Sequence, residues 1–130
     1  DPWPLNPEGE LFLGLKIEDR HCVENVDEIA TVPGIAFAEW GPGDMGMSYG
    51  LPDAHDPPYP EIMDQAREKI KTALKKNNKV FYSSWNDFSM NPEERIKFII
   101  EELGSGMVGG PDIVEMASAG RKLTARKMPY

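Results

Sequence analysis

Two carboxylates that follow consecutive apolar runs are the residues of this chain best suited to chemistry. Glu18 comes directly after the apolar run 11–17, and Asp44 follows the next run, 35–40, in a Gly-Pro-Gly-Asp turn that begins at Gly41. Parallel βα units bring the ends of neighbouring strands to one edge of a sheet, where α/β proteins place their active sites. Hard divalent cations prefer carboxylate oxygens. The pair therefore predicts a metal site, with Glu18 and Asp44 as ligands.

The turn before Asp44 is suited to an anionic substrate. Gly41 and Gly43 allow the backbone to turn tightly and to approach an anion closely, which a side chain would obstruct. Pro42 and Gly43 are therefore expected at the substrate. Trp40 stands immediately before the turn, and it could either line the pocket or fill the top layer of the core.

The elements that must position these residues alternate short apolar runs with segments of helical periodicity. This βαβα order predicts a parallel sheet. Strands are expected at 11–17, 35–40, 80–83 and 106–109. Helices are expected at 22–30, between Pro60 and Asn77, from Asn91 and from about 111, and a long loop is expected over 41–60. The helix from Asn91 has this residue as its N-cap, Pro92 at its first position and Glu94 as the capping-box partner.

Each expected helix carries an apolar stripe that should face the core. The stripes comprise Val23, Val26, Ile29 and Ala30; Ile62, Ala66, Ile70, Ala73 and Leu74; Ile96, Ile99, Ile100 and Leu103; and Ile113, Met116, Ala117 and Leu123.

Four βα units are half of an eight-stranded barrel, which typically needs roughly 250 residues. The 130 residues therefore predict an α/β fold of the TIM (β/α)8 type, present as a half-barrel in a single domain, 1–130. The start, Asp1-Pro2-Trp3-Pro4 without an initiator Met, also leads us to expect a stretch from within a larger protein. Because an isolated four-stranded parallel sheet would expose two edges and much apolar surface, we expect a homo-oligomer or a complementing N-terminal half.

Composition narrows the class of partner. Twenty-two acidic residues against 14 basic ones give a net charge of −8, which argues against nucleic acid and against anionic membranes. Small metabolites or proteins are expected instead. A single cysteine, Cys22, permits no internal disulfide and indicates a cytoplasmic, reducing compartment. No apolar run approaches the roughly 20 residues that a membrane span needs.

Several stretches together resemble the HpcH/HpaI aldolase and citrate lyase family. They are Gly14-Leu-Lys-Ile-Glu18, the helix end at Val32-Pro-Gly34, the turn at Gly41 and the ending Met107-Val-Gly-Gly-Pro-Asp112. The resemblance covers nearly the whole chain, as the C-terminal half of the family's barrel. It implies a class II pyruvate aldolase, a carbon–carbon lyase in which one Glu and one Asp hold a divalent ion, commonly Mg²⁺, Mn²⁺ or Co²⁺.

The resemblance also implies roles for particular residues. Glu18 and Asp44 match the two metal ligands, and Gly43 and Asp44 match the turn whose backbone N–H groups receive the carboxylate of pyruvate. The implied reaction makes or breaks a 4-hydroxy-2-oxo acid, with pyruvate and an aldehyde as partners, through a pyruvate enolate that the metal stabilises. The last helix of this family commonly packs on a neighbouring barrel, which again implies an oligomer.

Departures from the family keep other functions open. The family's catalytic Arg and its His-based proton-transfer group belong to the other half of the barrel, so the catalytic residues are unassigned here. Met45-Gly46 follows the aspartate where the family often has Leu-Ser. One alternative is a catalytically silent fragment or interaction module that keeps metal affinity. Another is a citrate-lyase-type lyase of coenzyme A thioesters, although the Gly-Pro before Asp44 favours the aldolase branch.

The remaining polar residues near the site have simpler interpretations. Lys16 shares strand parity with Glu18 and is expected to point into the barrel and to pair with a carboxylate such as Glu39. His21 and His55 are expected in loop roles. Residues 83–87 follow the third strand on the same edge and could contact the distal part of a substrate. Met45 and Met47 are expected to pack within the loop.

Overall fold

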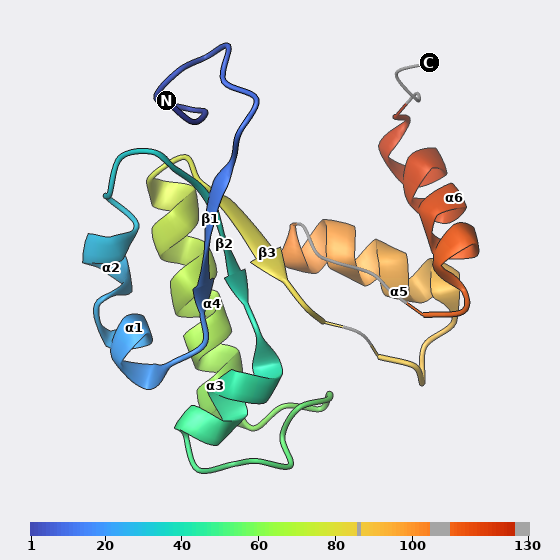
Figure 1. Cartoon of the computed structure of the whole chain (residues 1–130). Coiled ribbons are helices and arrows are strands. Elements are labelled where there is room, and N and C mark those ends of the chain that lie inside the picture. The colour runs from blue at the N-terminus through green and yellow to red at the C-terminus, as the bar shows by residue number, and fades with distance from the viewer. Residues whose placement is uncertain (86, 105–109, 127–130) are drawn as a thin grey trace.

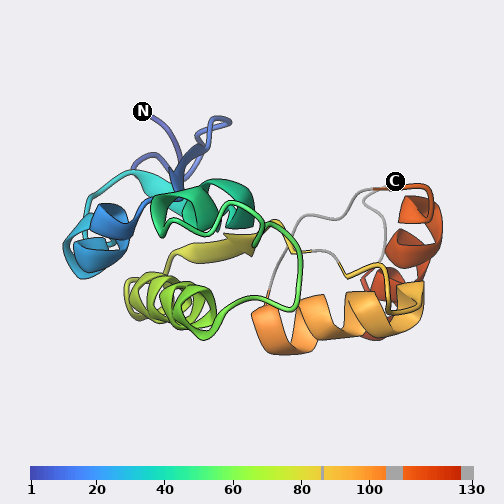
Figure 2. The same ribbon diagram turned by 90° about the horizontal axis from the view of Figure 1, so that it is seen from below.

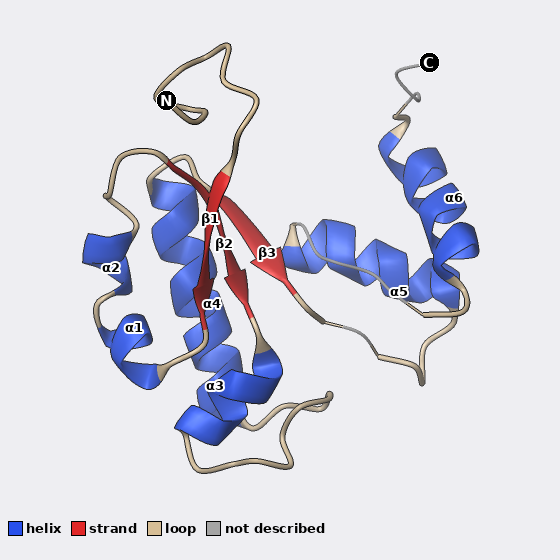
Figure 3. Ribbon diagram, in the orientation of Figure 1, coloured by secondary structure: helices blue, strands red, loops and turns tan. Residues whose placement is uncertain are grey.

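Three predicted strands form one parallel sheet in the computed structural model, which describes residues 1–85, 87–104 and 110–126 (Figure 1). They are β1 (Leu13–Ile17), β2 (Ile35–Trp40) and β3 (Val80–Ser83), in the order β1-β2-β3. Figure 3 shows the three arrows pointing the same way, so their carboxyl ends share one edge. The expected strand at 106–109 lies outside the described residues.

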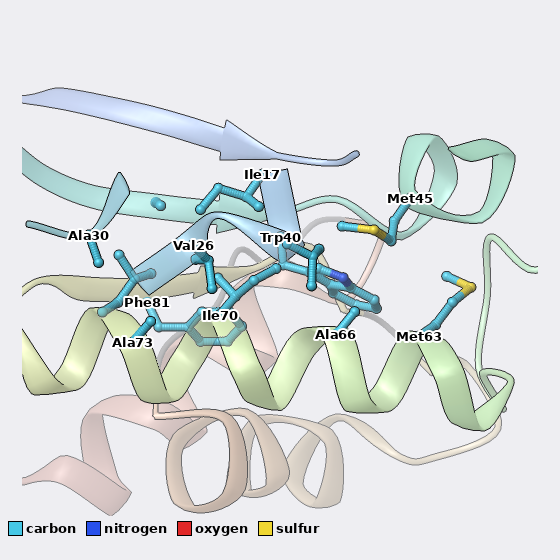
Figure 4. Packing of buried hydrophobic residues seen from close by; sticks show 13 residues of the cluster. Ile17, Val26, Ala30, Trp40, Met45, Met63, Ala66, Ile70, Ala73 and Phe81 are labelled. Carbon is cyan, nitrogen blue, oxygen red and sulfur yellow. The ribbon is translucent and has the colours of Figure 1, made fainter. Parts of the chain in front are cut away.

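One face of the sheet packs against helix α4 (Glu61–Lys76), beside the short helices α1 (Arg20–Glu24) and α2 (Val26–Ile29) (Figure 2). Figure 4 shows Ala66 and Ile70 of α4 pointing at the side chain of Trp40. Each large apolar side chain buried in this way stabilises the fold by roughly 2 kcal/mol. The predicted stripe of α4 is confirmed except at its start, where Met63 is buried and Ile62 is exposed.

The helix expected at 22–30 is divided in two at Asn25. The side-chain amide of Asn25 donates a 2.8 Å hydrogen bond to the carbonyl of His21, so this residue ends α1 and begins α2. Asparagine competes in this way with the helix backbone, which explains the break. The apolar periodicity survives it, because Val23 and Val26 are both buried.

The loop expected over 41–60 begins with a helix, α3 (Pro42–Ser48), so that prediction is wrong for these seven residues. Pro42 occupies the first helical position, where its missing N–H costs nothing, and Asp44 lies in the first turn, where an acidic side chain is favourable. Met45 is buried in the core rather than packed within a loop, whereas Met47 is exposed.

A second apolar cluster joins the C-terminal helices, and its buried members are Trp85, Ile96, Ile99, Leu103 and Met116. Helix α5 (Pro92–Phe98) has the predicted capping box and continues as a π-helical segment, Ile99–Leu103. Helix α6 (Ile113–Thr124) packs on α5, and the buried guanidinium of Arg95 forms an ion pair with Asp112 at its start.

The predicted apolar stripe of α6 is only partly buried. Met116 is enclosed, but Ile113 and Leu123 are 43% and 44% exposed, so their expected burial is wrong for the structure described. The reason is that α6 rests mainly on α5, which covers one side of the stripe.

The face of the sheet opposite α4 stays accessible over much of its area. An apolar groove of about 600 Å³ runs along it, lined chiefly by Trp3, Phe12, Phe37, Val80 and Tyr82. Phe37 lies over Gly14, in space that a side chain at position 14 would need. Separately, none of the helices in the described part of the chain is long and apolar enough to cross a membrane.

Candidate functional site

A cleft of about 420 Å³ lies at the carboxyl ends of the strands. Glu18 comes from the end of β1, and Asp44 comes from α3, which follows β2. The structure thus places both predicted ligands in the lining of one cleft. The cleft is also lined by four residues with polar side chains, Lys16, Glu39, His55 and Ser84, and by Gly43.

Glu18 is held in place by two neighbours. Its Oε1 atom lies 2.8 Å from Nζ of Lys16. The same oxygen lies against the backbone of Gly41, in space that a side chain at position 41 would fill. The absence of a side chain at Gly41 is therefore what lets the Glu18 carboxylate reach the turn that leads to Asp44.

Asp44 is an exposed residue in the first turn of α3. The first hydrogen bond of this helix runs from the N–H of Met45 to the carbonyl of Gly41, at 3.2 Å. The N–H groups of Gly43 and Asp44 precede it, and first-turn N–H groups have no acceptor within their own helix. Pro42 also lines the cleft, but it has no N–H and so cannot donate a backbone hydrogen bond to a substrate.

Trp40 lies in the core, so the structure favours packing over pocket lining for this residue. Its side chain is 0% exposed. Tyr59 meets its ring edge-on at a centroid distance of 5.1 Å, and the guanidinium of Arg67 lies 5.5 Å from the ring centroid. These contacts fix the last residue of β2 immediately before the turn that carries Asp44. Burial also raises the pKa of Tyr59 above its usual range.

Lys16 forms the expected ion pair, but its partner is Glu18 rather than Glu39. The hydrogen bond to Glu18 and the charge of that carboxylate raise the pKa of Lys16 above 10.5, and the charges of Glu39 and Asp44 add to the effect. Glu39 stands opposite Lys16 in the sheet and accepts a hydrogen bond from the hydroxyl of Ser84. The ion pair is as expected and only the partner differs, because Glu18, two residues further along the chain, places its carboxylate at the ammonium.

The two histidines differ in their relation to the cleft. His55 lines it from the loop after α3, where its Nδ1 atom lies 2.8 Å from Oδ2 of Asp56. His21 lies on α1 and contacts Glu24 at 3.4 Å. Both side chains are exposed, and of the two it is His55 that lines the cleft.

Segment 83–87 is divided between the site and the core. Ser84 lines the cleft, while Ser83 is buried and Trp85 belongs to the second apolar cluster. Asp87 accepts hydrogen bonds from Ser89, which lower the pKa of the carboxyl group, and residue 86 lies outside the described structure. From the sequence, Ser84 is expected only as one of five residues at this edge, and Glu39 only as a partner of Lys16. Strand parity is the signal that could have placed both beside the metal ligands.

The donor set fits a hard divalent cation that keeps open coordination positions. Within residues 1–85, 87–104 and 110–126, no group of three or more His, Cys, Asp or Glu side chains is arranged to enclose a metal. Two carboxylates in an accessible cleft leave the remaining positions to water or substrate, as Mg²⁺ sites in enzymes often do. Glu18 and Asp44 are the residues that would hold such an ion.

Comparison with known proteins identifies relatives for most of the chain. Residues 7–97 match the family model described as HpcH/HpaI aldolase/citrate lyase. The matched range includes Glu18, Asp44 and the whole turn between β2 and α3. A 2-keto-3-deoxy-L-rhamnonate aldolase of Klebsiella pneumoniae subsp. pneumoniae is 37% identical over 67 residues, which are 51% of this chain and 25% of that protein.

Solved structures share the fold. A citrate lyase from Burkholderia xenovorans LB400 superposes with a TM-score of 0.70 at 17% identity, covering 89% of this chain and 40% of that one. An HpcH/HpaI aldolase from Desulfitobacterium hafniense DCB-2 gives a TM-score of 0.61 at 21% identity, covering 92% and 44%. The chain thus has the mixed α/β fold of these proteins but spans less than half of their length.

Proposed function

We propose, because this chain belongs to the HpcH/HpaI aldolase/citrate lyase family, that it contributes the metal-binding half of a class II aldolase. The proposed reaction cleaves or forms a 4-hydroxy-2-oxo acid, with pyruvate as one partner and an aldehyde as the other. Membership of the family supports a lyase in general. The divalent metal and the substrate class are the parts that need experiment.

The observation that carries the proposal is the meeting of Glu18 and Asp44 in one cleft at the ends of β1 and β2. A divalent ion held there would act as a Lewis acid toward the keto group of a 2-oxo acid. The N–H groups of Gly43 and Asp44 would receive the substrate carboxylate, and the ring of Pro42 would pack beside it. Trp40 would act indirectly, by fixing the end of β2 from within the core.

The curated relative supports a 2-oxo acid as substrate. That protein is named as an aldolase of 2-keto-3-deoxy-L-rhamnonate, which is itself a 2-oxo acid.

The open face of the sheet supports a half-barrel that needs a complement. Phe37 and Tyr82 line an apolar groove where a closed barrel would have packed side chains. The described residues that line the cleft include no arginine, so an arginine at the substrate would come from elsewhere. We propose that a preceding barrel half or a second copy supplies it. The free Cys22 is compatible with the reducing, cytoplasmic setting that we propose for this assembly.

The experiment measures exchange of the methyl protons of pyruvate in D₂O by NMR, with and without Mg²⁺. Asp44→Asn removes one proposed ligand, and Asp53→Asn is the matched control because Asp53 is exposed in the loop outside the cleft. Exchange that needs both Mg²⁺ and Asp44, but not Asp53, would support the aldolase. If the chain binds no Mg²⁺, either alone or when assembled with a second copy or with a complementing barrel half, the proposed metal site is wrong.

The same experiment separates the two alternatives. Asp44-dependent Mg²⁺ binding without any exchange would favour a catalytically silent module, for which the lack of an arginine in the described cleft is the supporting observation. Affinity for coenzyme A without affinity for pyruvate would instead select a lyase of coenzyme A thioesters.

A further inference from the structure

Lys16 is a cation in direct contact with one of the proposed metal ligands. Its Nζ atom lies 2.8 Å from Oε1 of Glu18, and it lines the same cleft as Asp44. A lysine paired with a metal ligand should lower the affinity of the site for a divalent ion, because the ammonium and the ion would both interact with the Glu18 carboxylate. A divalent ion bound to either oxygen of Glu18 would lie close to the ammonium of Lys16 and would be repelled by it.

A second carboxylate is within reach of the displaced lysine. Glu39 lies opposite Lys16 in the parallel pairing of β1 with β2, on the same face of the sheet. The hydroxyl of Ser84 donates to Oε1 of Glu39 and holds this carboxylate beside the cleft. Among the residues that the structure describes, none donates a hydrogen bond to its Oε2 atom. Lys16 is thus placed between two acidic partners.

The lysine side of the pair with Glu18 is open to water. The side chain of Lys16 is 58% exposed, against 19% for Glu18, so the ammonium is not enclosed where it lies. Lysine is a flexible point charge with no fixed hydrogen-bonding plane, so its ammonium can pair with either carboxylate without a fixed geometry. A divalent cation at Glu18 and Asp44 would repel the ammonium and drive it toward Glu39.

We propose that Lys16 is a built-in counter-cation of the site, which occupies Glu18 when the metal is absent and shifts to Glu39 when the metal binds. This inference rests on the proposed function, since it assumes that Glu18 and Asp44 hold a divalent ion. Its consequence is that the chain sets its own metal affinity. Lys16 weakens the binding of the divalent ion, and Glu39 reduces this weakening by pairing with the displaced ammonium.

The test is the affinity for Mn²⁺ alone, measured on the full chain by electron paramagnetic resonance at fixed pH and ionic strength. Lys16→Gln removes the competing charge and should tighten binding about tenfold, the effect of one charge on a divalent ion a few ångströms away in a watery cleft. Lys16→Arg keeps the charge and should stay close to the wild type. Unchanged or weaker binding by Lys16→Gln would overturn the proposal.

A double-mutant cycle tests the shift to Glu39. Glu39→Gln should weaken Mn²⁺ binding in the wild type, and the loss should be smaller when residue 16 is already Gln, since no displaced charge then needs a partner. If Glu39→Gln lowers the Mn²⁺ affinity equally in both backgrounds, Glu39 acts only through its own charge. That result would overturn the proposed movement of Lys16 to Glu39.

These measurements separate the inference from the function beneath it. If the wild type binds Mn²⁺ in an Asp44-dependent way and Lys16→Gln binds equally well, only the role of Lys16 fails. If neither protein binds Mn²⁺, the metal site itself fails and the role of Lys16 with it. Circular dichroism of each variant shows whether the fold is retained, and a variant that binds Mn²⁺ more tightly cannot have lost it.

Discussion

The carboxylate of Glu18 lies against the backbone of Gly41, in the space that a side chain at position 41 would occupy. Glu18 directly follows β1, and Gly41 directly follows β2 and leads into α3. The contact therefore joins two strand ends that lie 23 residues apart in the chain (41 − 18). The geometry of the proposed metal site therefore depends on a residue that would not itself touch the metal.

Gly41→Ala should weaken divalent-metal binding by about tenfold or more, because the new methyl group would push the Glu18 carboxylate away from Asp44, and groups that orient ligands commonly have effects of this size. Mn²⁺ affinity measured by electron paramagnetic resonance checks it. Gly43→Ala is the matched control, since a Cβ there meets nothing within 4 Å. Equal affinities of the two variants would show that the contact with Gly41 does not position Glu18.

Trp40→Ala should lower the free energy of unfolding by about 3–5 kcal/mol, because it empties the space between Tyr59 and Arg67 in a site with no solvent exposure. Urea denaturation measures the change. Met47→Ala is the control on the other side of the turn. Met47 is 59% exposed, and its loss should cost no more than about 0.5 kcal/mol. A stable Trp40→Ala protein with weakened pyruvate affinity would instead place this tryptophan in the pocket.

The charge of Asp19 should stabilise the protein at neutral pH and cease to do so in acid. Asp19 accepts a 2.8 Å hydrogen bond from the N–H of His21 and a 3.2 Å bond from the hydroxyl of Ser48, which ties the start of α1 to the end of α3. The backbone bond from His21 is the main reason that the pKa of Asp19 lies below its usual 3.8. A carboxyl group with a lowered pKa in the folded state favours folding above its unfolded pKa, and this advantage disappears as the pH falls through the folded value.

Denaturation of the wild type and of Asp19→Asn across pH 7 to 2 measures this effect. The wild type should be the more stable protein at pH 7, and the difference should shrink below about pH 4. Asp53→Asn, in the exposed part of the loop after α3, controls for the loss of one negative charge. A difference between wild type and Asp19→Asn that persists unchanged at pH 2 would contradict the assignment.

Assembly should depend on the open face of the sheet. Phe37→Asp places a charge in the apolar groove and should abolish association with a complementing barrel half or with a second copy, as sedimentation equilibrium would show. Val114→Asp, on α6, tests the other candidate surface, since Val114 is 77% exposed. Loss of association in Val114→Asp alone would place the interface on α6, and retained association in both variants would contradict the need for either surface.

Predictions from the sequence succeeded where one local pattern decides the outcome. The strand at 35–40 and the capping box at Asn91 and Glu94 are as predicted, because each depends on residues that are neighbours in the chain. The helix at Pro42–Ser48 was missed because Gly and Pro disfavour helices in general, although Pro42 at the first position and Met45 in the core favour one here.

The sequence by itself determined the parallel α/β arrangement, the membership of the HpcH/HpaI family and the pair of carboxylates at consecutive strand ends. These follow from periodicity and from motifs that are contiguous in the chain. Only the tertiary structure decided that Lys16 pairs with Glu18, that Trp40 lies in the core and that Gly41 makes room for a carboxylate. The physical reason is that each of these facts depends on how side chains pack in three dimensions. Strand parity says which face of the sheet a side chain lies on, but several side chains on that face could make the same contact.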